Sequence, residues 1–208
     1  SHDPVLALMI ATQLGWVWML AGDHVAHERM RAALTAAGSA APDHLRLTGS
    51  LLLGWLYAAG GDVELGRTTI VDAIERFDFA GDELARARAD FFLAYVLSQQ
   101  GDFEACRRVL DRSRSVFVES GARWDEAANR VLFAHVTLAG GDLAQATAAC
   151  TDAARLLAEV GDPWFLVHTQ AMSGAVAQAE ARYGDACGHL AAAAEAAHTQ
   201  GFASTEAY

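Results

Sequence analysis

The chain has 208 residues, of which 53% are hydrophobic and only three are proline. Its formal net charge is −11, and all 15 basic residues are arginine. An acidic chain without a basic stripe repels phosphate backbones, so nucleic-acid binding by this segment is not expected. The lack of lysine also excludes Schiff-base and phosphate-loop lysine chemistry.

The first predicted elements are a helix at roughly 4–21 and a second at roughly 23–37. The first carries no charge from Pro4 to Gly22 and is almost long enough to span a bilayer. However, no basic residue precedes it, and the polar residues Thr12 and Gln13 lie in its middle. We therefore interpret it as a buried repeat helix and expect no membrane partner.

Two interleaved turn signals follow along the chain. Gly-Asp steps are spaced by 39, 40, 40 and 43 residues, and they begin at Gly22, Gly61, Gly101, Gly141 and Gly184. A second glycine series lies between them, at Gly38, Gly81, Gly121, Gly161 and Gly201. In each Gly-Asp step the glycine can close one helix in the left-handed conformation, and the aspartate can cap the next. This period predicts a tandem repeat with two helices per unit.

The predicted repeats lie at about 4–38, 43–81, 82–121, 122–161 and 162–201. Together they predict one repeat domain over residues 1–208. The last repeat is the weakest match, and the three extra residues before its Gly184-Asp185 turn predict a slightly altered helix pair. The abrupt start and end of the pattern predict a fragment of a longer protein.

Small and large residues keep a fixed order within the units. The second unit contains Leu53-Gly54-Trp55, then Gly61-Asp62, then Gly66 and Ala73. This order resembles the tetratricopeptide repeat (TPR), in which small residues let the two helices of a unit approach closely. The resemblance implies an all-α fold, an α-α superhelix (TPR-like solenoid) of about five helix pairs with ~40-residue repeats.

A tryptophan soon follows two glycines of the second series, in Gly121 to Trp124 and Gly161 to Trp164. Such units resemble the MalT-like, LuxR-type or antibiotic-regulatory-type sensor arrays of large bacterial transcriptional regulators. The resemblance implies a non-catalytic protein- or ligand-binding repeat module that acts as a sensor and assembly scaffold. The alternative is a stand-alone peptide-binding or chaperone-type TPR scaffold unrelated to transcription.

In arrays of this kind the first helix of each unit lines a concave groove. The resemblance then implies that the groove carries a ladder of rings made by Trp16, Trp55, Phe91, Tyr95 and His135. Aromatic rings supply large contact areas, which suits a protein or peptide partner or a small apolar ligand. The competing interpretation is that some of these rings fill space between repeats.

The first helix is apolar on every side and needs neighbours on both. We therefore predict self-association through Met9 and Val17, as a homodimer formed by the N-terminal helix pair.

No catalytic motif, metal-ligand set or cofactor fingerprint occurs, so we expect neither an enzyme nor a metal or cofactor site. Cys106, Cys150 and Cys187 lack redox spacing, and buried free thiols fit a cytoplasmic protein.

Overall fold

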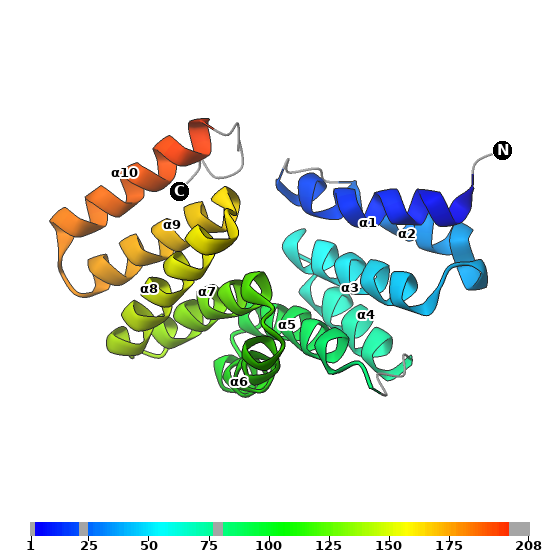
Figure 1. The fold of residues 1–208 in the computed structure, drawn as a ribbon, viewed down its shortest axis with the longest axis horizontal. Coiled ribbons are helices and arrows are strands. Elements are labelled where there is room, and N and C mark those ends of the chain that lie inside the picture. The colour runs from blue at the N-terminus through cyan, green and yellow to red at the C-terminus, as the bar shows by residue number, and fades with distance from the viewer. Residues whose placement is uncertain (1–2, 21–24, 77–80, 200–208) are drawn as a thin grey trace. The chain divides into compact units, whose positions relative to one another are not determined.

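The computed structural model describes residues 3–20, 25–76 and 81–199, without the side chains of Trp16, Val17, Met19, Leu20 and Trp164. Ten α-helices and one 3₁₀ turn (Gly38–Ala40) occupy these ranges. The helices are α1 (Pro4–Leu20), α2 (Ala26–Ala37), α3 (Asp43–Ala59), α4 (Val63–Arg76), α5 (Glu83–Gln99), α6 (Phe103–Ser120), α7 (Arg123–Ala139), α8 (Leu143–Val160), α9 (Pro163–Ala179) and α10 (Tyr183–Thr199) (Figure 1).

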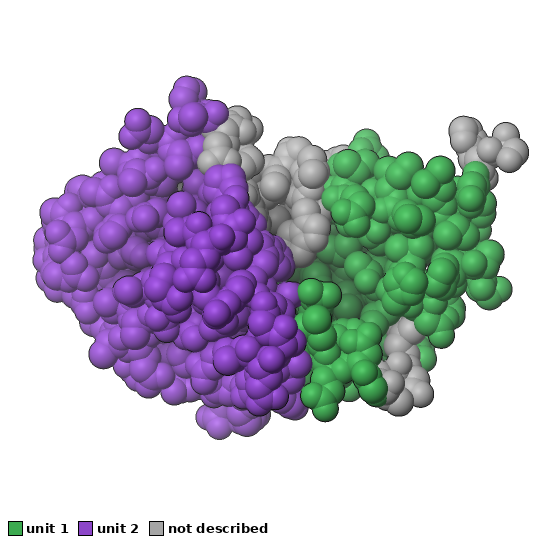
Figure 2. All heavy atoms as spheres, viewed as in Figure 1, with its two compact units in different colours: residues 1–102 green, residues 103–208 purple. Residues whose placement is uncertain are grey.

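The chain divides into two compact units, residues 1–102 with α1 to α5 and residues 103–208 with α6 to α10 (Figure 2). Within each unit, helices adjacent in sequence pack together. Helices two apart also meet: α1 with α3, α3 with α5, and α7 with α9. No strand occurs in the described ranges, and no described helix is long and apolar enough to cross a membrane. That both units form one domain stays a prediction.

The glycines of three Gly-Asp steps adopt the expected left-handed conformation. Gly61, Gly101 and Gly141 all adopt positive φ, between 77° and 97°. The amide that follows then donates back across the helix end; for example, Asp142 N–H donates to the Thr137 carbonyl at 2.9 Å. The same Asp142 carboxylate accepts from Gln145 N–H at 3.1 Å, which caps α8. The residue that ends one helix and the residue that caps the next are therefore adjacent in sequence. The Gly22-Asp23 step lies outside the described residues.

The fifth turn differs from the sequence-based prediction. Helix α9 ends at Ala179 and α10 begins at Tyr183, so Gly184-Asp185 lies inside α10. Ala181 takes the left-handed position instead, with φ of 58°, and Arg182 N–H donates to the Ala177 carbonyl at 2.8 Å. The expected boundary was wrong because an alanine adopts a conformation usually left to glycine.

Close helix packing in the second repeat depends on two facing glycines. A methyl group added at Gly66 would lie 2.5 Å from the Gly54 carbonyl oxygen and 2.9 Å from the Ala58 amide nitrogen. A methyl group at Gly54 would lie 2.5 Å from Ile70. The backbones of α3 and α4 therefore approach too closely for any side chain, as the TPR resemblance implied.

Two buried polar residues of α7, Asn129 and Glu126, have partners on neighbouring helices or on α7 itself. Asn129, fully buried on α7, donates to the Ser113 hydroxyl at 2.9 Å and to the Leu110 carbonyl at 3.1 Å. These bonds join α7 to α6. Arg130 joins α7 to α8, because it pairs with Glu126 on its own helix and with Asp152 on α8, both at 2.8 Å. Paired in this way, the buried Glu126 carboxylate avoids the cost of an isolated charge.

A second connection joins the starts of α7 and α9. The Trp124 indole N–H donates to the Asp162 carboxylate at 2.6 Å. Its ring also lies edge-on to Phe165, with centroids 5.0 Å apart. Asp162 caps α9 at the same time by accepting from Phe165 N–H at 3.0 Å. Trp124 is thus a packing anchor between successive repeats.

Candidate functional site

Three predicted groove residues gather in the first unit, on α3 and α5. The Trp55 ring contacts the Tyr95 ring edge-on, with centroids 5.9 Å apart, and the Phe92 ring at 6.2 Å. Phe92 in turn meets Phe91 at 6.0 Å. These four residues form one aromatic cluster, in which Phe91, Phe92 and Tyr95 are half-buried. The half-buried rings keep apolar surface accessible to a partner.

Trp55 is the floor of this cluster and does not lie on its surface. Its side chain is only 6% exposed and packs in the hydrophobic core with Leu52 and Leu56. A residue that lines a groove should be partly exposed, and Trp55 is not, because rings from α5 cover the indole. Trp55 therefore offers little exposed surface for direct contact with a partner. The side chain of Trp16, the first member of the predicted ladder, lies outside the described residues.

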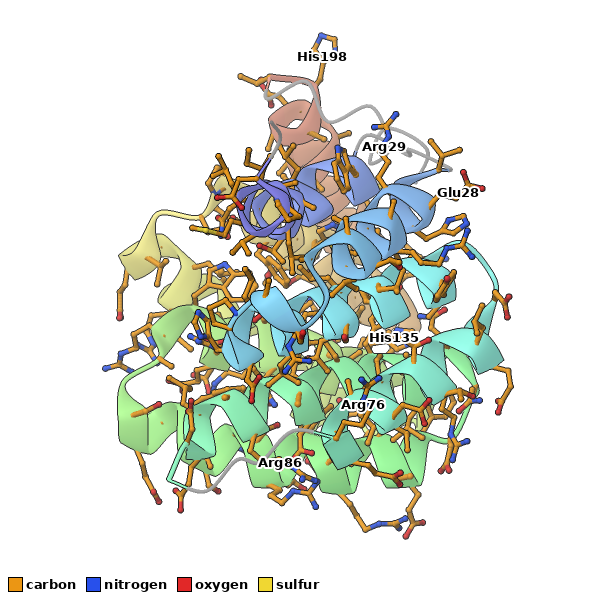
Figure 3. The ribbon with its side chains drawn as sticks, turned by 90° about the vertical axis from the view of Figure 1, so that its right-hand side faces the viewer. Glu28, Arg29, Arg76, Arg86, His135 and His198 are labelled. Atoms are coloured by element: carbon orange, nitrogen blue, oxygen red, sulfur yellow. The ribbon has the colours of Figure 1, made fainter. Side chains whose placement is uncertain are left out.

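The remaining groove candidate, His135, lies on α7 in the second unit (Figure 3). It is exposed, and its ring lies edge-on to Phe103 at 6.3 Å. Although much of the residue meets solvent, loss of water around the ring lowers the pKa of His135 below its ordinary value. A neutral imidazole can both donate and accept a hydrogen bond. Its membership of a binding surface stays a prediction.

The self-association residues lie on α1. Met9 is 51% exposed and shares one stripe of the helix with Leu6, Ile10 and Leu14, which are exposed as well. The opposite side of the helix is buried through Leu8 and Ala11. Helix α1 is therefore apolar on both its inner and its outer side, as the sequence indicated. The side chain of Val17 lies outside the described residues.

The structure also shows features that the sequence did not. Arginines that looked scattered in the sequence, Arg31, Arg46 and Arg76, line one pocket in the first unit. Cys187 is exposed, against the expectation of three buried thiols, because α9 is the one described helix that packs on α10. Among the described residues, no three metal-ligating side chains lie together.

Comparisons by sequence give no match, either among protein-family models or among curated proteins. Solved structures do match. BtubC (BKLC) from P. vanneervenii is 19% identical with a TM-score of 0.67, covering 96% of this chain and 84% of that one. A putative kinesin light chain from Podosopora anserina with nearly identical TPR-like repeats is 15% identical with a TM-score of 0.62, covering 96% and 99%.

A third match is a Rap protein complexed with Competence and Sporulation Factor, with a TM-score of 0.79 at 12% identity. It covers 97% of this chain, and this chain spans 57% of that one. At such low identities these likenesses concern the fold alone. Together with the ten paired helices, they confirm that this chain is an all-α array of TPR-like repeats.

Proposed function

We propose that this chain is a non-catalytic scaffold that binds a protein or peptide partner through the aromatic cluster of its first unit. The observation that supports this most is the set of half-buried rings on α5, Phe91, Phe92 and Tyr95, held in place by the buried Trp55. Rings that are preorganised by packing lose little entropy on binding, which is typical of interface hot spots.

The finer form of this proposal is a sensor and assembly module of a bacterial transcriptional regulator. The resemblance of its units to LuxR-type sensor arrays supports it, as does the fold shared with a Rap protein that binds Competence and Sporulation Factor. The alternative is a stand-alone peptide-binding scaffold. A nucleotide-binding module upstream in the same reading frame would favour the regulator.

Peptide binding can be tested with a peptide selected from a random library on the immobilised chain. We expect Tyr95→Ala to weaken binding of that peptide by about 2 kcal/mol, roughly 30-fold in Kd, because a partly exposed aromatic anchor is lost. Tyr183→Ala is the matched control, since Tyr183 is 65% exposed on α10 and lies outside the cluster. Isothermal titration calorimetry measures both, after circular dichroism has shown each variant folded. Equal losses in the two variants would contradict the proposal.

The exposed stripe of α1 supports a second part of the proposal, a homodimer through the N-terminal helix pair. In a two-fold arrangement the same apolar stripe meets itself, and the uncharged α1 brings no like charges together. A sizeable apolar patch on a surface commonly marks an interaction site.

For this dimer we expect Met9→Glu to give a folded monomer at high micromolar concentration, because the charge would be buried in the interface. Sedimentation equilibrium distinguishes the two states. Val118→Glu is the control, since Val118 is 50% exposed on α6 and lies far from α1 in sequence. An unmodified chain that sediments as a monomer under these conditions would overturn the dimer.

A further inference from the structure

A pocket of about 440 Å³ opens in the first unit between α2, α3 and α4. Helices α2 and α4 both pack against α3, and the pocket lies where these two meet it. Each of the three helices contributes one arginine to its lining, Arg31, Arg46 and Arg76. Figure 3 shows Arg76 at the end of α4. The volume falls in the range of small-molecule sites.

The charge in this pocket is opposite to that of the chain. Three arginines and a single acidic residue, Asp72, line the pocket, whereas the whole chain carries −11. Arg46 pairs with Asp43 at the start of α3. Within the part of the chain that the structure describes, Arg31, Arg76 and Asp72 make no ion pair. Two guanidinium groups therefore keep their hydrogen-bond donors available for a ligand.

The floor of the pocket is apolar. Leu53 and Ala73 are buried there, and Leu34 is half-buried beside them. An apolar wall lowers the local dielectric and strengthens the attraction between an arginine and a bound anion. Ser50, half-buried in the lining, makes no hydrogen bond to a described residue, so its hydroxyl can donate to an anion as well.

We propose that this pocket binds a small organic anion with about two negative charges, carried by phosphate or carboxylate groups. Guanidinium groups form paired hydrogen bonds with either group, and the apolar floor suits the carbon skeleton of the ligand. A small ion fits better than a polyanion, because the chain's net charge of −11 repels a long chain of phosphates.

This site is separate from the proposed peptide-binding surface. Arg46, Ser50 and Leu53 follow three- and four-residue steps, so they share one side of α3. Trp55 lies two residues beyond Leu53, a rotation of about 200° around the helix. Failure of anion binding would therefore leave peptide binding intact, and the reverse holds too.

Isothermal titration calorimetry on the whole chain, with succinate in one arm and phenyl phosphate in the other, tests the proposal. We expect a Kd below about 1 mM for at least one probe. Arg31→Gln and Arg76→Gln should each raise that Kd about tenfold, because each removes one charged hydrogen-bonding partner. The arm that binds identifies the anionic group.

Arg67→Gln is the matched control, because Arg67 lies on α4 outside the pocket lining with its side chain 45% exposed. It should bind the probe as the unmodified chain does. The proposal is overturned if neither probe binds with a Kd below about 1 mM, or if Arg67→Gln loses as much affinity as Arg76→Gln. The proposal is also wrong if an acidic peptide binds and neither small anion does, since the pocket would then recognise a protein segment.

Discussion

Replacement of Trp55 with alanine is expected to lower the free energy of unfolding by about 3–5 kcal/mol. The indole is buried between the core of the first unit and the rings of Phe92 and Tyr95. Removing it would leave a cavity and would also remove the support on which both rings lie. Urea unfolding followed by circular dichroism measures the loss as a shift of the midpoint.

Tyr183→Ala serves as the comparison, because that exposed ring on α10 should cost no more than about 0.5 kcal/mol. A Trp55→Ala variant as stable as the unmodified chain would show that the indole is not part of the core. Our assignment of Trp55 as the buried residue that holds the rings of Phe92 and Tyr95 in place would then be wrong.

The second large effect is expected at Gly66. Substitution by alanine should destabilise the chain by about 1–3 kcal/mol, as for other overpacked sites. The new methyl group would lie 2.5 Å from a backbone oxygen of α3, and backbone cannot swing aside as a flexible side chain can. This cost opposes the gain of about 1 kcal/mol that alanine brings to a helix interior. Thermal or urea unfolding gives the net result.

Gly188→Ala is the matched substitution. Gly188 also lies inside a helix, α10, but a methyl group there meets no atom within 4 Å. It should stabilise the chain by about 0.5–1 kcal/mol, the helix-propensity term alone. If the two variants shift stability in the same direction, close approach of α3 and α4 does not limit residue 66.

The helices were predictable because their boundaries are encoded locally. A left-handed glycine and a capping aspartate need only their own neighbours, so Gly61-Asp62 and Gly141-Asp142 could be found by eye. The prediction was wrong at Gly184-Asp185 because a Gly-Asp dipeptide can form a turn but can also lie inside a helix. There the chain reverses three residues earlier, at Ala181, which adopts the left-handed conformation.

The candidate site was less predictable, since it depends on which side of a helix faces which neighbour. Trp55 has the spacing of a groove residue, but only the position of α5 shows that Phe92 and Tyr95 cover it. The arginine pocket is harder still. Arg31 and Arg76 are separated by a whole repeat in sequence, and they share a pocket only because α2 and α4 both pack on α3.

The Asp162 carboxylate performs two tasks, as cap of α9 and as acceptor of the Trp124 indole. Successive first helices of the second unit are thereby tied at their starts by a short polar bond as well as by side-chain packing. Sliding or rotation of one repeat against the next would have to break that bond, and the capping contact holds the Asp162 carboxylate in place for it. The joint between these two repeats should therefore behave as a stiff element under load, and any bending of the unit should concentrate at joints without such a tie.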